Sequence, residues 1–184
     1  MSSVRIGLIG AGTIGRIHAK TMGKAKGAEL AAIVDVDEGR AESLAKEHGL
    51  KKFYTDYLEM LEKESPDAVF VATPNYLHAK MTTDSLSRGA HVFCEKPIAM
   101  NAAEAQAMID AKRKYGKMLM LGMVQRFTCE AETIREVVRA GTLGNIYYTD
   151  VTLLRRMGIP GMRSWFTTKE FSGGGPLADI GPHA

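Results

Sequence analysis

The stretch VRIGLIGAGTIGRIH, residues 4–18, constrains the fold more than any other part of this sequence. A short apolar run leads directly into Gly10, Gly12 and Gly15 in G-x-G-x-x-G spacing, and apolar residues at helical intervals follow over 13–24. The pattern predicts a strand, a tight turn and a helix. In such a unit Gly10 forms the turn, Gly12 lets a pyrophosphate approach the backbone, and Gly15 packs the helix on the sheet. The N-terminus of the helix, with its free N–H groups and positive dipole end, then stabilises the bound phosphates.

The same alternation of strand and helix continues along the chain. Further strands are predicted over 29–36, 51–54, 67–73, 90–95 and 117–122, and further helices over 38–49, 57–64, 75–89 and 102–115. Asn101 and Glu104 have the spacing of a capping box at the start of the last of these helices, and Gly116 ends it. Alternation of this kind predicts a parallel, doubly wound sheet with right-handed crossovers.

The character of the sequence changes after Gly122. A helix is predicted over 128–140, ending at Gly141, and an alternating, β-branched strand over 145–156 has no crossover helix after it. We therefore expect a domain boundary near Gly122.

Composition limits the class of protein. The chain has 184 residues, of which 45% are apolar and 24% charged, as in an ordinary globular protein. The net charge of +3 is small and dispersed, which argues against a nucleic-acid partner. Its two cysteines, Cys94 and Cys129, provide neither a disulfide framework nor paired metal ligands, and we expect no metal. We see no leader and no long apolar run, so we expect a cytoplasmic protein without a membrane partner.

Asp35 ends the second predicted strand, twenty residues after Gly15. An acidic side chain there can accept hydrogen bonds from the adenosine ribose hydroxyls and would repel a 2′-phosphate, so NAD is favoured over NADP. The alternative is that Asp35 or Asp37 only caps the following helix, and Arg40 leaves NADP open. The fingerprint indicates a nucleotide site and does not identify a reaction.

Four stretches together resemble one enzyme family. GAGTIGRIH, ATPNYLHA, CEKPIAMN and GGGPLADIGPHA, in this order, are similar to the glucose-fructose oxidoreductase and inositol dehydrogenase family, Gfo/Idh/MocA, and within it to inositol 2-dehydrogenases. The resemblance implies a two-domain, NAD-dependent dehydrogenase. Such an enzyme moves a hydride between a nicotinamide and a carbon bearing a hydroxyl group, usually on a sugar or cyclic polyol. It also implies a homo-oligomer.

The resemblance also implies roles for individual residues. Lys96 matches the lysine that binds the reacting oxygen, and Asp179 and His183 match the acid and the histidine that complete the catalytic site. The implied cofactor-binding residues are Gly10, Gly12, Thr13, Ile14, Gly15, Asp35, Thr73, Pro74, Asn75, His78, Glu95, Lys96 and Gln125. The implied substrate-binding residues are Lys96, Arg126, Trp165, Asp179 and His183.

The chemistry of these residue types agrees with such roles. Oxidation of a secondary alcohol needs a base for the hydroxyl proton, which suits His183, and a cation near the oxygen, which suits Lys96. A spacing of four puts Asp179 and His183 on one face of a helix, and Pro182 is expected to kink that helix.

Members of the family continue well beyond this histidine into a broad, mostly antiparallel sheet. We therefore expect a fragment: an α/β Rossmann domain over 1–122, followed over 123–184 by the beginning of an incomplete α+β domain. Two hypotheses follow. The first is the amino-terminal part of an NAD-dependent sugar or polyol dehydrogenase, and the alternative is a catalytically silent NAD-binding fragment or sensor.

Overall fold

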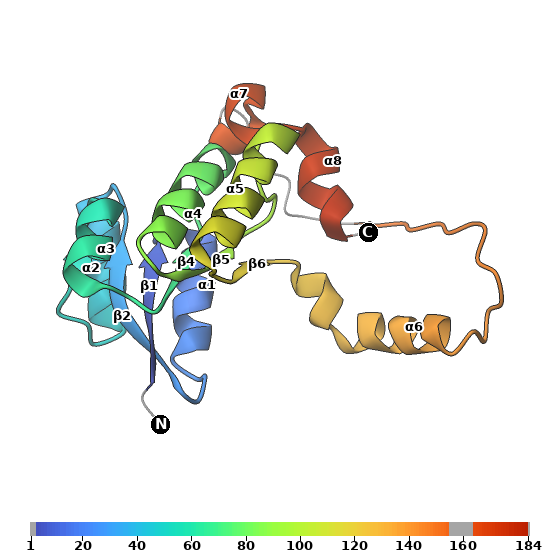
Figure 1. Cartoon of the computed structure of the whole chain (residues 1–184), viewed down its shortest axis with the longest axis horizontal. Helices are drawn as coiled ribbons and strands as arrows, with labels where there is room; N and C mark the ends of the chain where they lie inside the picture. Colours follow the sequence, from blue (N-terminus) through green and yellow to red (C-terminus); the bar gives the residue numbers. More distant parts are fainter. Residues whose placement is uncertain (1–2, 155–163, 184) are drawn as a thin grey trace.

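The computed structural model of the chain describes residues 3–154 and 164–183. Its centre is one sheet of six parallel strands in the order β3-β2-β1-β4-β5-β6 (Figure 1). The strands are β1 Val4–Ile9, β2 Ala28–Val34, β3 Phe53–Tyr54, β4 Ala68–Val71, β5 His91–Cys94 and β6 Leu119–Leu121. The predicted parallel, doubly wound sheet is therefore confirmed.

Helices cover both faces of the sheet. They are α1 Thr13–Met22, α2 Glu38–Glu47, α3 Tyr57–Glu64, α4 His78–Ser87 and α5 Ala102–Tyr115, with a 3-10 turn, η1 Asn75–Leu77, before α4. Helices α1 and α2 pack on the face that carries Ile6 and Leu8, while α3, α4 and α5 pack on the face that carries Ile9 and Val69. Two apolar cores, one on each face, thus hold the sheet.

Local sequence signals explain where several helices begin and end. The Asn101 side chain accepts from the Glu104 N–H at 3.0 Å, as the predicted cap requires. The Glu104 carboxylate reaches back to the Met100 N–H at 3.1 Å, one residue before the N-cap, and not to the N-cap N–H of a capping box. Gly49 and Gly116 follow α2 and α5 with φ of 70° and 62°, a region that suits glycine at a helix end.

The order of the strands reverses between β1 and β4, so the loops after these two strands flank a crevice at the carboxyl end of the sheet. Gly10 lets the two loops come close together. Its φ is +105°, and a Cβ at this position would lie 2.4 Å from the carbonyl oxygen of Ala72. A side chain here would therefore push the two loops apart.

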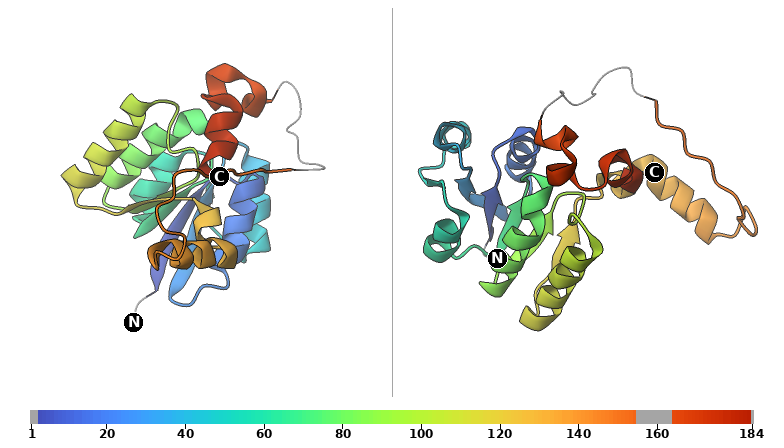
Figure 2. Two further views of the ribbon diagram at one scale, coloured as in Figure 1. Left: turned by 90° about the vertical axis from the view of Figure 1, so that its right-hand side faces the viewer. Right: turned by 90° about the horizontal axis from the view of Figure 1, so that it is seen from above.

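The residues after β6 leave the layered core. They form η2 Val124–Phe127 and α6 Cys129–Arg139, which lie to one side of the sheet (Figure 1). The chain then forms η3 Trp165–Thr167, α7 Lys169–Ser172, α8 Gly175–Ile180 and η4 Gly181–His183. Helices α7 and α8 lie over the end of the sheet opposite the N-terminus (Figure 2). No helix in the described ranges is long and apolar enough to cross a membrane.

The strand predicted over 145–156 is wrong for the part that is described, because residues 146–154 have no regular secondary structure. Tyr147 and Leu154 are 95% and 90% exposed. A strand needs a neighbour for its backbone N–H and C=O groups, and none lies beside this segment among the described residues. Residues 155 and 156 of the predicted strand lie outside the described residues.

Candidate active site

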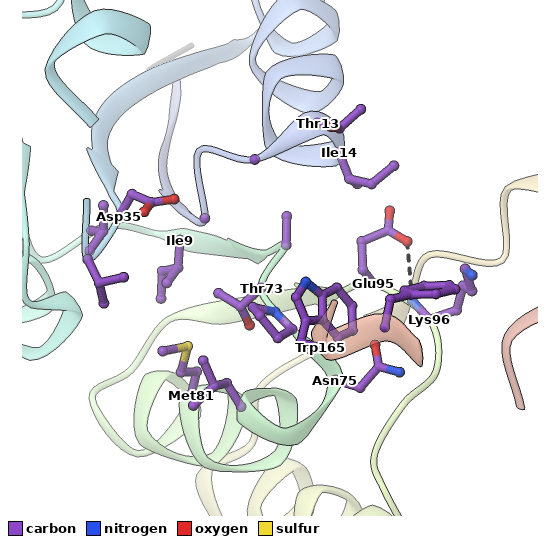
Figure 3. Close-up of a pocket in the computed structure, with 18 of the residues that line it drawn as sticks. Ile9, Thr13, Ile14, Asp35, Thr73, Asn75, Met81, Glu95, Lys96 and Trp165 are labelled. Atoms are coloured by element: carbon purple, nitrogen blue, oxygen red, sulfur yellow. Dashed lines mark hydrogen bonds between the residues drawn. The ribbon is translucent and has the colours of Figure 1, made fainter. Parts of the chain in front are cut away.

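A cavity of about 1080 Å³ opens at the carboxyl end of the strands. Figure 3 shows Asp35 at one end of the cavity and Glu95 and Lys96 at the other, with Thr73 and Trp165 between them. Twelve predicted site residues line it, namely Gly10, Gly12, Thr13, Ile14, Asp35, Thr73, Pro74, Asn75, Glu95, Lys96, Trp165 and Asp179. The shape is elongated, with an acidic group at one end and a lysine with carboxylates at the other.

The glycine-rich loop presents bare backbone to this cavity. A Cβ built on Gly12 would meet nothing within 4 Å, so open space lies in front of it. The first turn of α1 has no side-chain cap and no acidic residue. Its N–H groups and dipole end therefore suit a phosphate group, as the fingerprint predicts.

Asp35 and Asp37 have different tasks. The Asp37 carboxylate accepts from the Arg40 N–H and caps α2, and its hydrogen bonds with the backbone and side chain of Arg40 lower its pKa. The Asp35 carboxylate instead accepts from the Ala11 N–H at 2.8 Å and lines the cavity. Asp35 is thus held beside the glycine-rich loop, where a ribose hydroxyl could reach it, and it is not the helix cap.

The loop after β4 forms the middle of the cavity wall. Thr73 lines the cavity, and its hydroxyl oxygen is buried with no hydrogen-bond partner among the described residues. Asn75 is buried, and its side-chain amide donates to the Ser172 carbonyl at 3.0 Å. That bond ties α7 to the loop. Together, the open space at Gly12, the unpartnered hydroxyl of Thr73 and the carboxylate of Asp35 fit a dinucleotide cofactor.

Lys96 and Asp179 meet at the other end of the cavity. The Lys96 ammonium forms an ion pair with the Asp179 carboxylate and also donates to the Asp179 carbonyl at 3.2 Å. Beside them, burial would raise the pKa of the Glu95 carboxyl. However, the hydrogen bond from His18 and the charges of His18 and Lys96 outweigh burial and hold that pKa below its ordinary value. This end of the cavity therefore carries the Lys96 cation and two carboxylates, of which Asp179 pairs with the ammonium.

Trp165 and Phe166 add an aromatic wall, with ring centroids 5.2 Å apart. His183 does not line the cavity. It lies in η4, because α8 ends at Ile180 and the chain continues as a 3-10 turn around Pro182. The sequence predicts Asp179 and His183 on one face of a single helix. Instead, Asp179 lies near the end of α8 and His183 in the 3-10 turn that follows it. The Nδ1 atom of His183 is buried without a partner among the described residues.

Four other predicted residues lie outside the lining. Gln125 and Arg126 are exposed in η2, which packs against η4. Gly15 has a packing task, since a Cβ there would lie 1.8 Å from the Gly10 carbonyl oxygen. His78 is buried behind the loop, between the carbonyls of Thr73 and Pro97.

Sequence reasoning missed several residues of the site. Lining residues outside the predicted set include Ile9, Val36, Tyr57, Met81, Phe166 and Ile180. His18 contacts Glu95 directly, and a signal for it existed, because it is the polar residue in the otherwise apolar stripe of α1.

Cys94 does not have the setting of a nucleophile. Cys94 is buried, which raises the pKa of its thiol to about 12. Cys129 is exposed at the start of α6. Within residues 3–154 and 164–183 no group of three His, Cys, Asp or Glu side chains is arranged to hold a metal ion.

Comparison with known families agrees with this geometry. Residues 4–123 match the oxidoreductase family with the NAD-binding Rossmann fold, and residues 131–184 match its C-terminal domain. The chain belongs to the Gfo/Idh/MocA family. Among its relatives is the D-glucoside 3-dehydrogenase of Escherichia coli K12, 41% identical over 99% of this chain and 52% of the relative.

Solved structures with the same fold are also found. An NAD-binding protein from Listeria innocua superposes with a TM-score of 0.86 and 29% identity, covering 99% of this chain and 52% of that one. The scyllo-inositol dehydrogenase of Lactobacillus casei was solved with NAD(H) and scyllo-inositol. It superposes with a TM-score of 0.75 and 27% identity, covering 78% of this chain and 43% of that one. The chain thus spans about half the length of the Gfo/Idh/MocA relatives that it matches.

Proposed function

We propose that this protein is an NAD-dependent oxidoreductase that transfers a hydride between nicotinamide and a secondary hydroxyl of a sugar or cyclic polyol. The observation that carries the proposal is the Lys96–Asp179 ion pair, which faces the same cavity as the glycine-rich loop and Asp35. D-Glucosides and scyllo-inositol, named for two relatives, both present secondary hydroxyls on a six-membered ring.

In this proposal, the glycine-rich loop, Thr73 and Asp35 would hold NAD, which would supply the acceptor for the hydride of the carbinol carbon. Lys96 holds the hydroxyl oxygen of the substrate and stabilises the negative charge that develops there as the proton leaves. Asp179 accepts a hydrogen bond from a neighbouring hydroxyl and holds the lysine. His183, which lies in η4 outside the cavity lining, would have to reach the substrate to take the proton from the hydroxyl oxygen. With the proton lost from the oxygen and the hydride lost from the carbon, the carbinol becomes a ketone.

Asp35 supports NAD as the preferred cofactor. Its carboxylate is fixed by the N–H groups of Ala11 and Asp37, at 2.8 and 3.0 Å, and cannot turn away from a ligand without losing both bonds. A ribose 2′-hydroxyl can donate to this carboxylate, while a 2′-phosphate would be repelled. The Arg40 guanidinium, which could attract such a phosphate, is engaged by Asp37.

A second candidate function is an NAD-binding protein without turnover. It is favoured by the exposure of Tyr147 and Leu154, which are 95% and 90% exposed and close no wall of the cavity. A substrate must be held within a fraction of an ångström for hydride transfer, which requires a closed wall.

Two measurements on the 184-residue chain test both candidates. NAD binding is measured by calorimetry, and NADH formation is followed by absorbance over a panel of inositols and D-glucosides. The first candidate requires turnover that is abolished in Lys96→Ala. The control is Lys80→Ala, at an exposed lysine paired with Asp84, which should leave turnover intact. Binding without turnover on any substrate favours the second candidate, and absence of NAD binding refutes both.

A further inference from the structure

Lys96 is the middle residue of Glu95–Lys96–Pro97, the segment that follows β5. Each neighbour of Lys96 is hydrogen-bonded to a histidine, His18 on one side and His78 on the other. Neither histidine lines the cavity. Both are therefore available for a task other than touching substrate or cofactor.

His18 holds Glu95 from helix α1. Its Nε2 atom lies 2.7 Å from Oε1 of Glu95. The ring is wedged edge-on against Phe70 and Phe93, with centroids 5.4 and 5.3 Å away, and these two rings stack on each other. Apolar walls thus leave the imidazole few alternative positions.

Glu95 transmits this constraint to Lys96. While Oε1 faces His18, Oε2 accepts from the backbone N–H of Lys96 at 3.2 Å (Figure 3). Gly122 makes room for the carboxylate, because a Cβ there would lie 2.9 Å from its atoms. One carboxylate thereby joins α1 to the backbone of the lysine.

His78 holds the other side from helix α4. It is 1% exposed, with Nδ1 2.7 Å from the Pro97 carbonyl and Nε2 2.9 Å from the Thr73 carbonyl. A carbonyl oxygen only accepts, and a neutral imidazole has a single N–H. Burial lowers the pKa of His78 although both carbonyls oppose this, so the ring is neutral near pH 7. We assign its N–H to the shorter contact, with Pro97.

The two histidines approach from opposite faces of the sheet. Helix α1 packs with the core that contains Leu8, and α4 packs with the core that contains Val69. We propose that His18 and His78 form a two-sided clamp on Glu95–Lys96–Pro97 that fixes the direction of the Lys96 side chain. They are positioning residues, and the inference rests on the proposed function of Lys96.

The clamp has a physical purpose. A lysine side chain has many rotamers and moves freely unless its backbone and its ammonium are both held. Asp179 holds the ammonium, and the histidines hold the backbone on either side. A displacement of about 1 Å at such a group costs about a hundredfold in rate.

The contacts allow matched substitutions. In His18→Gln the amide nitrogen can take the place of Nε2 and keep the bond to Glu95, whereas His18→Phe keeps the aromatic packing and loses the bond. In His78→Asn the amide nitrogen replaces Nδ1 and keeps the bond to Pro97, whereas His78→Gln replaces Nε2 and keeps only the contact with Thr73. His91→Gln is the control, since His91 begins the same strand and accepts from the Met118 N–H at its other end.

The first readout needs no turnover. Whole variants of the 184-residue chain are treated with acetic anhydride, and the acetylation rate of Lys96 relative to exposed Lys114 is followed by mass spectrometry. We expect His18→Phe and His78→Gln to raise this ratio at least about threefold, since a loosened lysine leaves Asp179 more often. His18→Gln, His78→Asn and His91→Gln should leave it unchanged.

Two further readouts separate positioning from general damage. In an active enzyme, kcat should fall about tenfold to a hundredfold in His18→Phe and His78→Gln while the Kd for NAD stays constant. A Lys96 ratio that stays at the wild-type value in both variants overturns the clamp. The clamp is also overturned if the Lys96 acetylation ratio changes in parallel with the melting temperature across all five variants. If the Lys96 ratio changes as expected but neither the wild type nor any variant turns over substrate, the clamp is supported and the proposed function is refuted.

Discussion

Lys96 and Asp179 form an ion pair across 83 residues of sequence, and this pair joins the loop after β5 to helix α8. Their side chains are 20% and 22% exposed, so the pair is partly shielded from water. Leu177 in the same short helix is 81% exposed, so apolar packing contributes little there. The ion pair is therefore one of the contacts that hold α8 over the carboxyl end of the sheet.

Substitution Asp179→Asn tests this role. Asparagine keeps the shape and an acceptor but loses the charge, and hydrogen bonds to charged groups contribute about 1.5–3 kcal/mol against about 1 kcal/mol for neutral ones. We expect amide hydrogen exchange in residues 177–183 to become about threefold to tenfold faster. Asp150→Asn, at an exposed carboxylate bonded to Thr152, is the control and should change nothing in this segment. Unchanged exchange in Asp179→Asn would mean that other contacts, such as Asn75 with Ser172, hold the helix.

Asp35 and Asp37 allow a second prediction. Asp35→Asn should weaken NAD binding about tenfold and reduce the preference for NAD over NADP, because the charge that repels a 2′-phosphate is gone. The measurement is calorimetric titration with both cofactors.

The neighbouring aspartate is the control for that substitution. Asp37→Ala removes the cap of α2 and should cost about 1 kcal/mol in the free energy of unfolding. Because it also frees Arg40, it should shift cofactor preference toward NADP, but less than Asp35→Asn does. If the two variants changed cofactor preference equally, Asp35 would not be the residue that discriminates.

The fold followed from the sequence because each local signal agreed with the same architecture. Asn101 caps the predicted helix by accepting from the Glu104 N–H, Gly116 ends the helix, and the glycine-rich loop lies at the point where the strand order reverses. The strand prediction is wrong for residues 145–154. Alternation of apolar residues indicates a strand only if a neighbouring strand pairs with its backbone N–H and C=O groups.

The candidate site was less predictable than the fold. Short motifs indicated Asp35, Glu95, Lys96 and Asp179, all of which line the cavity. The contact of His18 with Glu95 joins positions 77 residues apart, and the bond of His78 to Pro97 joins the start of helix α4 to the segment after β5. Such pairings depend on the packing of helices against the sheet, which no local pattern records.

Gly12 and Gly15 give a third prediction, since they are equally part of the fingerprint yet differ in surroundings. Gly12→Ala places a methyl group in open space, so the melting temperature should be unchanged while NAD affinity falls about tenfold. Gly15→Ala places a Cβ 1.8 Å from the Gly10 carbonyl and should destabilise the fold by at least about 2 kcal/mol. Thermal denaturation and calorimetry check both. A stable Gly15→Ala protein would contradict the packing assigned to this glycine.

The last prediction concerns acid. The pKa of Glu95 lies below its ordinary value of 4.5, because the hydrogen bond from His18 and the nearby charges outweigh burial. A carboxyl whose pKa is lower in the folded state stabilises the fold above its unfolded pKa, and this stabilisation is lost as the pH falls through the folded pKa. The unfolding free energy gained from Glu95 should therefore decline below about pH 4.5.

Urea denaturation of the wild type and of Glu95→Gln, from about pH 7 to about pH 3, measures that contribution as the difference between the two. In a His18→Phe background the pKa of Glu95 should lie higher, so the difference should be smaller and should disappear at a higher pH. The double variant completes the cycle, because removing His18 should have no effect on acid dependence once Glu95 is gone. An equal effect of His18→Phe with and without Glu95 would show that the histidine acts through the aromatic cluster of Phe70 and Phe93 instead of the carboxylate.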